Sequence, residues 1–545
     1  MPISELLMPA GSLDKLKVAI LYGADAVYMG TPDLSLRTRS TMSLEDVVEG
    51  VAYAHAHGKR AYLTLNLFSH NRDIEKLPFF IDTIRKAKPD GVIIADPGVF
   101  AYVREAAPEL ELHISTQANV CSWLSVQFWE KQGASLVVLA REVSYAELRE
   151  VREKCPDVRL EAFVHGAMCM TYSGRCLLSN YLAERGANQG NCANSCRWHY
   201  KLHLKLKDGS LQEIELNEHN KDLFEFLLEE EQRPGELLPI EENERGSYIL
   251  NAKDLCLLPK LPDYLSIGID SLKVEGRNRS AYYIAVTARA YRQAIDDWRR
   301  APEAWRPDPY MKELHTIPTR GYSLAFHEGK LSHHAHNYED THTLSPWEYA
   351  GMIIRVTDEA FYVDIKNRIE YGDVLEFIPH NDRASMFLRI YTFEDVHHRR
   401  TVTEEGINAG QRPLLRIPFE WFHEEEPARL AKDFPCFTIL RKERALTPEE
   451  WKRLELDRIG AARELGLDQE RTYLESRDAL AQAIDEGREG RVFRSPRLGA
   501  EGCCGRGCNG CLHFWHDPKY EKARAKLTAK KMGELLSSDE RKTDI

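Results

Sequence analysis

The feature that most constrains the fold of this chain is the alternation of β-rich runs and amphipathic segments across its first 300 residues. The segments between the first seven runs begin with Ser and end at Gly or Pro, which are ordinary helix boundaries. Strands that alternate with helices form parallel sheets. Eight runs predict an α/β fold with a (β/α)8, TIM-like barrel over residues 1–310. The predicted strands are 5–11, 26–30, 61–66, 91–98, 112–119, 136–142, 160–166 and 270–277.

Polar residues end most of these runs. Catalytic groups of such barrels lie at the carboxyl ends of the strands, so this set predicts a polar mouth. For any one of them, a capping or ion-pairing role at the rim is an equally good interpretation. The set is Asn66, Asp96, Gln117, Asn119, Arg141, Glu142, His165, Lys273, Glu275 and Arg277.

The rest of the chain divides by composition. A cysteine-rich loop at 166–196 follows the seventh run directly, and the alternating pattern after it predicts an inserted hairpin within 197–250. Short runs with Gly, Asn and Pro predict a small all-β domain at 311–440. A charged helical connector at 441–500 and a Cys-rich, basic tail at 501–545 complete the prediction.

Four cysteines of the loop are candidate ligands: Cys169, Cys176, Cys192 and Cys196. Convergent thiolates suit tetrahedral zinc or an iron–sulfur cluster. Zinc sites usually contain two closely spaced pairs, and only the last two cysteines are close, so the spacing favours a cluster. The alternative is four thiols buried as small apolar groups.

The tail holds a second set of cysteines, Cys503, Cys504, Cys508 and Cys511. Their spacing includes C-x3-C-x2-C, but the motif lies far beyond the barrel, so we interpret it as a small zinc or iron–sulfur knuckle. Basic and aromatic residues at 197–207 and 519–531 are candidate RNA contacts, with solvated surface as the alternative.

Composition argues against several classes of protein. No run approaches the length of a membrane span, and no leader pattern opens the chain, so we expect a cytoplasmic protein without a membrane partner. Twelve cysteines among 545 residues are too few for a disulfide scaffold. A net charge of −12 argues against a protein that coats nucleic acid, although a local basic patch can still grip a structured RNA.

The stretch "EAFVHGAMCMTYSGRCLLS" resembles the signature of the collagenase-like peptidase family U32. The stretches "MPAGSLDKLKVAILYGADAVYMG" and "DSLKVEGRNRSAYYIAVTARAYRQAIDD" extend the resemblance over most of residues 3–440. The resemblance implies an oxygen-independent RNA hydroxylase that forms 5-hydroxyuridine at the wobble position of tRNA. It also implies an iron–sulfur cluster, of the 4Fe-4S type, on the four loop cysteines, with Cys256 as a reserve ligand. A carboxylate oxygen donor such as prephenate and the iron–sulfur assembly machinery are the further expected partners.

Chemical roles follow for the mouth residues. Hydroxylation of a uracil carbon is redox chemistry for which side chains offer no agent, whereas a cluster supplies electrons. Arg141 and Arg277 are candidates to hold the carboxylate donor. His165 and Glu142 are candidates to move protons, and Glu275 completes the predicted catalytic set.

Three alternatives stay open. Relatives within the family imply hydroxylation of an rRNA cytidine by the same chemistry. The family name implies a peptidase, for which Cys169 and nearby His165 could form a nucleophile and base, although that leaves three loop cysteines unexplained. The third alternative is a non-catalytic RNA-binding module. An enclosed polar mouth would indicate an enzyme rather than such a module.

Overall fold

The computed structural model describes residues 4–30, 42–67, 69–169, 252–329 and most of 343–454. It also describes isolated positions between 171 and 182 and the backbones of five strands between 203 and 248. The short gaps after residue 343 are 381–383, 397–399, 403–405, 410–413, 423–425, 449 and 452–453.

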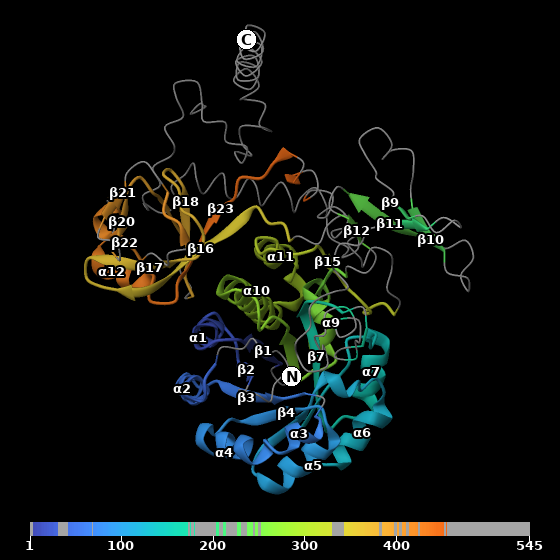
Figure 1. Cartoon of the computed structure of the whole chain (residues 1–545). Helices are drawn as coiled ribbons and strands as arrows, with labels where there is room; N and C mark the ends of the chain where they lie inside the picture. The colour runs from blue at the N-terminus through green and yellow to red at the C-terminus, as the bar shows by residue number, and fades with distance from the viewer. Residues whose placement is uncertain are drawn as a thin grey trace. The chain divides into compact units, whose positions relative to one another are not determined.

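Eight parallel strands close into a barrel, which confirms the predicted fold class (Figure 1). Each strand pairs with the next along the sheet, and β14 pairs with both β1 and β7, so the sheet has no open edge at this point. The strands are β1 (Glu5–Ala10), β2 (Ala26–Gly30), β3 (Arg60–Leu65), β4 (Gly91–Ile94), β5 (Glu111–Ile114), β6 (Leu136–Val138), β7 (Arg159–Gly166) and β14 (Ser271–Val274).

Helices surround the barrel strands, and serine caps begin many of them as the sequence predicts (Figure 1). The hydroxyl oxygens of Ser12, Ser43, Ser122, Ser144 and Ser280 each accept a hydrogen bond from the backbone N–H three residues on. The helices are α1 (Leu13–Leu21), α2 (Leu44–Ala56), α3 (Asn71–Ile74), α4 (Leu77–Ala87), α5 (Pro97–Ala106), α6 (Trp123–Lys131), α7 (Tyr145–Lys154), α9 (Leu261–Ser266), α10 (Ala281–Arg300) and α11 (Asp308–Leu314).

Several predicted strands are too long at their carboxyl ends: the sixth stops at Val138 and the eighth at Val274, short of the predicted ends at 142 and 277. The fourth stops at Ile94 because Asp96 caps α5, where its carboxylate accepts from the backbone N–H groups of Gly98 and Val99. The fifth stops at Ile114 because a 3-10 turn follows and Asn119 adopts a left-handed conformation with φ of 52°. The loops that shape the mouth therefore begin earlier than the sequence indicates.

The inserted segment contains two small sheets. β8 (His203–Lys205) and β9 (Leu211–Glu213) pair antiparallel, as the predicted hairpin requires. β10 (Phe226–Glu229), β11 (Leu237–Asn243) and β12 (Gly246–Tyr248) form a second antiparallel sheet.

Two further strands extend the barrel sheet beyond β7. β13 (Asp254–Cys256) pairs antiparallel with the end of β7, and β15 (Tyr322–Ser323) pairs with β13. The first compact unit of the chain runs to Leu344, beyond the predicted boundary at residue 310. The difference arises because α11 and β15 belong with the barrel.

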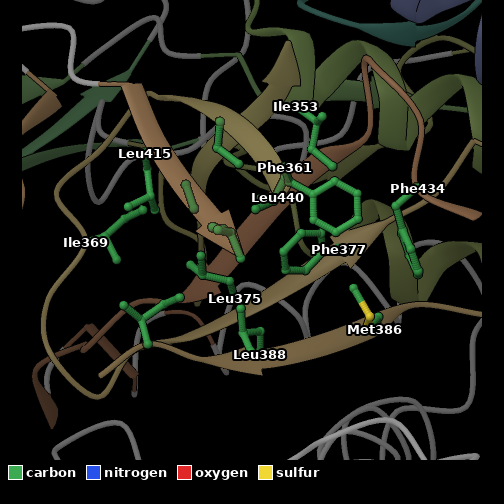
Figure 2. Packing of buried hydrophobic residues seen from close by; sticks show 14 of the residues in the cluster. Ile353, Phe361, Ile369, Leu375, Phe377, Met386, Leu388, Leu415, Phe434 and Leu440 are labelled. Atoms are coloured by element: carbon green, nitrogen blue, oxygen red, sulfur yellow. The ribbon is translucent and has the colours of Figure 1, made fainter. Parts of the chain in front are cut away.

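The second compact unit is built on an eight-stranded antiparallel sheet. Its strands are β16 (Trp347–Val356), β17 (Ala360–Ile365), β18 (Val374–Ile378), β19 (Met386–Arg389), β20 (Phe393–Asp395), β21 (Arg400–Val402), β22 (Leu414–Pro418) and β23 (Ile439–Glu443), and α12 (Pro427–Asp433) lies before the last strand. One face buries an apolar cluster centred on Phe361 and Phe377, whose ring centroids lie 5.7 Å apart (Figure 2). Burial of such rings supplies the main stabilisation of a small sheet domain.

None of the helices in the described ranges is long and apolar enough to cross a membrane.

Candidate active site at the mouth of the barrel

Three cationic side chains gather over two aromatic rings at the carboxyl ends of the barrel strands. The Cζ atom of Arg141, just after β6, lies 4.0 Å from the ring centroid of Phe163 on β7. Lys273 on β14 places Nζ 4.5 Å from the ring centroid of Tyr28 on β2 and 5.6 Å from that of Phe163. The Cζ atom of Arg277, three residues after β14, lies 5.8 Å from the Tyr28 ring. We call Arg141, Lys273 and Arg277 the cation cluster.

Hydrogen bonds fix the two guanidinium groups of the cation cluster. Arg277 donates from Nη1 to Oγ1 of Thr64 over 2.9 Å, and Arg141 donates from Nη1 to the Ala167 carbonyl over 2.6 Å. Each of these hydrogen bonds restrains the direction of its guanidinium group. Arginine held in this way suits recognition of a carboxylate or phosphate.

Several buried polar atoms after β5 and β6 have no hydrogen-bond partner among the described residues. They are Nε of Arg141, one carboxylate oxygen of Glu142, and both amide atoms of Asn119. Buried polar atoms are normally satisfied, so a cluster of unsatisfied ones next to a cationic centre indicates a ligand site. Sequence reasoning placed all three residues at the mouth.

Glu142 is the mouth residue best suited to carry a proton. Burial raises the pKa of its carboxyl, and the neighbouring Arg141 guanidinium opposes that shift. A carboxyl with a raised pKa holds a proton closer to neutral pH than an exposed one does. Its predicted role in moving protons remains a prediction.

Asn66 and Gln117 meet across the mouth. Asn66 donates from Nδ2 to Oε1 of Gln117 over 3.3 Å, and Ser115 donates to the same oxygen. Asp96, in contrast, caps α5, so its carboxylate serves the helix N-terminus.

His165 faces away from the barrel interior. Its ring lies 5.6 Å from the ring of Tyr291 and 5.8 Å from that of Tyr283, both on α10, and 5.4 Å from that of Tyr322. Burial lowers the pKa of His165 to about 3, so the imidazole is neutral at physiological pH. The structure therefore separates His165 from the cation cluster with which the sequence grouped it.

Glu275 contacts the residues at the start of the cysteine loop. Its Oε2 accepts a hydrogen bond from the Ala167 N–H over 3.4 Å. Gly166 lies against it with φ of 121°, and a Cβ on Gly166 would meet the Glu275 carbonyl oxygen at 2.7 Å. Only glycine allows this close approach, so Gly166 and Glu275 together set the direction in which the chain leaves β7.

Cys169 lies three residues beyond β7 with an exposed side chain. An exposed thiol beside the mouth fits a cluster ligand, and Arg141 and Glu275 both bind Ala167, two residues before it. The other predicted ligands, Cys176, Cys192 and Cys196, lie outside the described residues. So do the tail cysteines Cys503, Cys504, Cys508 and Cys511.

Cys256, the reserve ligand, lies in the core. Its side chain is fully buried, its Sγ is 3.8 Å from the Met311 Sδ, and burial raises the pKa of its thiol to about 12. A buried thiol of this kind is an apolar packing group rather than a thiolate. Within the described part of the chain, His, Cys, Asp and Glu do not gather in any group of three that could hold a metal ion.

Sequence reasoning missed two buried carboxylates of the barrel unit. Glu161 lies in the apolar run of β7, and Asp254 on β13 pairs with Arg279 and Arg320. A charged residue within an apolar strand is itself a signal, since buried charges are rare unless they are paired. On this criterion, the sequence run "LEAFVHG" identifies Glu161 as a buried charged residue that needs a partner.

Comparison with known proteins identifies the family of this chain. The model of peptidase family U32 matches residues 11–337. A protein of Haemophilus influenzae named tRNA hydroxylation protein P is 38% identical over 76% of this chain and 93% of its own length. The 23S rRNA 5-hydroxycytidine C2501 synthase of Escherichia coli is 30% identical over 54% of this chain and 39% of its own. The Collagenase of Porphyromonas gingivalis is 30% identical over 61% of this chain and 76% of its own. The family model covers more than half of the sequence, and the chain belongs to peptidase family U32.

Proposed function

We propose that this chain is a tRNA hydroxylase that forms 5-hydroxyuridine at the wobble position without molecular oxygen. The observation that carries the proposal is the cation cluster with its unsatisfied polar neighbours at a barrel mouth. Relatives named for tRNA hydroxylation match the chain over nearly their whole lengths, which supports tRNA as the substrate. An enzyme that modifies tRNA acts where tRNA is found, so the proposed location of the protein is the cytoplasm.

An iron–sulfur cluster on Cys169, Cys176, Cys192 and Cys196 is part of this proposal. Such a cluster supplies electrons, which the side chains of the mouth cannot do. Cys169 fits this role, since its thiol is exposed beside the mouth and the backbone before it is held by two polar residues. The chain would need the iron–sulfur assembly machinery as a partner.

Arg141 and Arg277 would bind and orient a small carboxylate that donates the oxygen, such as prephenate. Their guanidinium groups are held by Ala167 and Thr64, so a carboxylate would meet preorganised donors. The guanidinium groups lie against the rings of Phe163 and Tyr28, and apolar surroundings strengthen the attraction between a guanidinium group and a carboxylate. Glu142 would hold the proton exchanged with the bound donor.

A reconstituted assay tests the proposal. Protein purified without oxygen is analysed for iron and sulfide, then mixed with unmodified tRNA and prephenate, and the nucleosides are measured by mass spectrometry. We expect bound iron and a new 5-hydroxyuridine signal that disappears in the Cys169→Ser variant. Protein that carries iron but leaves every tRNA uridine unmodified would refute the assigned reaction.

An rRNA cytidine is the second candidate substrate, because a 23S rRNA hydroxycytidine synthase is also similar to this chain. The same assay with rRNA distinguishes the two, since 5-hydroxycytidine would appear in place of 5-hydroxyuridine.

A peptidase is less well supported by the geometry. The histidine nearest to Cys169 in sequence is His165, whose neutral ring is enclosed by tyrosines of α10 and β15. A cysteine nucleophile needs a base within hydrogen-bond reach, and His165 is turned away from the mouth. Casein hydrolysis that is lost in Cys169→Ser would favour this alternative over ours.

A further inference from the structure

A buried ion pair joins the Lys273 member of the cation cluster to a carboxylate in the interior of the barrel. Lys273 on β14 and Glu161 on β7 meet with Nζ and Oε1 2.7 Å apart. Their side chains are 5% and 0% exposed, respectively. Ser271 donates from Oγ to the other oxygen of Glu161 over 2.8 Å, so both oxygens of this carboxylate are held.

Aliphatic side chains usually fill this position. The interior of a (β/α)8 barrel is normally a packed core of Val, Ile and Leu. Burying two charges is costly, and replacing a buried ion pair by apolar residues of similar volume is often neutral or stabilising. The stability of the fold therefore does not explain why the chain buries this ion pair. A role in the chemistry of the mouth would explain it.

The surroundings lower the pKa of the Lys273 ammonium below its ordinary value. Burial lowers the pKa of Lys273, Glu161 raises it, and Arg277 and Arg141 lower it again. Tyr28 and Phe163 enclose the same ammonium with their rings. A lysine with a depressed pKa is a recognised form of acid–base group.

Glu161 also acts on two groups that lie on strands two places away from β7 in the barrel sheet. Glu161 adds to the effect of burial in raising the pKa of Glu5 on β1. It opposes the effect of burial on the pKa of His113 on β5. The carboxylate of Glu161 therefore acts on titratable groups of β1 and β5 as well as on Lys273.

We propose that Lys273 is an acid–base residue of the mouth and that Glu161 is the group with which it exchanges a proton. In the exchange an N–H bond of the ammonium breaks and an O–H bond forms on the carboxylate, so ammonium and carboxylate become amine and carboxylic acid. The net charge of the pair does not change, so the transfer needs no counterion in a dry interior. The amine can then take a proton from a ligand bound between Arg141 and Arg277. This inference rests on the proposed function, since it assigns the mouth a reacting ligand.

The Lys273→Arg variant separates charge from proton transfer. Arginine keeps the positive charge but cannot be deprotonated in a protein. We expect prephenate affinity, measured by calorimetry, to stay within about threefold, while hydroxylation falls by about 100-fold or more. A hydroxylation rate within about threefold of the unaltered enzyme would overturn the proposal, and so would a loss of rate that simply follows a loss of affinity.

A matched control is available in the sheet domain. Lys442 is also nearly buried, with Nζ 2.8 Å from a carboxylate oxygen of Asp373, but it lies in the second compact unit. We expect Lys442→Arg to leave both prephenate affinity and hydroxylation unchanged.

The Glu161→Gln variant gives a signed prediction for the pH profile. Because Glu161 raises the pKa of Lys273, its removal lowers that pKa. The limb of the rate profile at which Lys273 loses its proton should therefore move to lower pH, by about one unit or more. An unmoved limb in folded Glu161→Gln protein would overturn the proposal.

A measurement on the unaltered protein avoids any question of folding. Prephenate binding is followed by calorimetry in buffers of different ionisation enthalpy, at a series of pH values from neutral up to the limit of stability of the fold. We expect proton uptake that grows with pH, because a bound anion stabilises the ammonium form of Lys273, and no uptake at any pH would overturn the proposal. Unaltered protein that leaves tRNA unmodified refutes the proposed function, whereas active Lys273→Arg protein refutes only this inference.

Discussion

At the scale of single residues, Arg277 offers the clearest test of ligand binding. Its Nη1 is fixed by Thr64, and lysine cannot keep this bond and also present a planar pair of donors to a carboxylate. We expect Arg277→Lys to weaken prephenate binding by about 10- to 100-fold, the usual effect of losing a charged hydrogen bond. Calorimetry measures this, with Arg85→Lys on the exposed face of α4 as the control. Affinity within about twofold of the original would contradict the assignment.

His165 should make stability depend on pH in a definite direction. Its pKa in the folded state is about 3, below the ordinary value of 6.5, so the unfolded chain takes up the proton first as pH falls. Its contribution is complete above pH 6.5 and is lost between pH 6.5 and 3, by about 2 kcal/mol at pH 5. Urea unfolding of the original and of His165→Gln at pH 7.5 and 5 should show a smaller difference at the lower pH. Parallel changes in the two proteins would show that His165 is protonated in the fold.

At the scale of elements, the end of β7 decides where the cysteine loop goes. An alanine at position 166 would bring its Cβ to 2.6 Å from the Glu275 Cβ, besides straining a positive φ. We expect Gly166→Ala to lower the free energy of unfolding by about 3 kcal/mol and to lower the iron content of the purified protein.

Gly268→Ala is the matched control, because Gly268 also has a positive φ but has no described atom within 4 Å of the added Cβ. It should cost only about 1 kcal/mol of backbone strain and leave the iron content unchanged. Equal iron in both variants would show that Gly166 does not direct the loop.

The same strand shows what the sequence could and could not predict. The sequence analysis placed His165 at the mouth because it is the polar residue that ends the seventh run, and simple alternation would keep it on the same face as Glu161 and Phe163. The register against β14 shifts between Lys273 and Val274, which turns His165 to the outer face. A bulge is set by pairing with a strand more than 100 residues away, so alternation within one strand cannot reveal it.

At the scale of the whole molecule, closure of the barrel sheet brings together site residues that are far apart in sequence. Arg141 and Arg277 are 136 residues apart in sequence, yet both lie over rings of the barrel interior because β14 returns to pair with β7 and β1. The eight-strand pattern predicted this closure, since local hydrophobic runs specify strands. The partners of each arginine, Thr64 and Ala167, were not predictable, because they depend on loop geometry at the mouth.

The most direct test of the central claim is the 5-hydroxyuridine content of tRNA in cells that lack this protein and any second enzyme of the same activity. Nucleosides are measured by mass spectrometry after the cells receive the original chain, Arg277→Lys or Arg85→Lys. The account predicts that the original and Arg85→Lys restore 5-hydroxyuridine and that Arg277→Lys restores far less. An unchanged absence of 5-hydroxyuridine with the original chain present would contradict it.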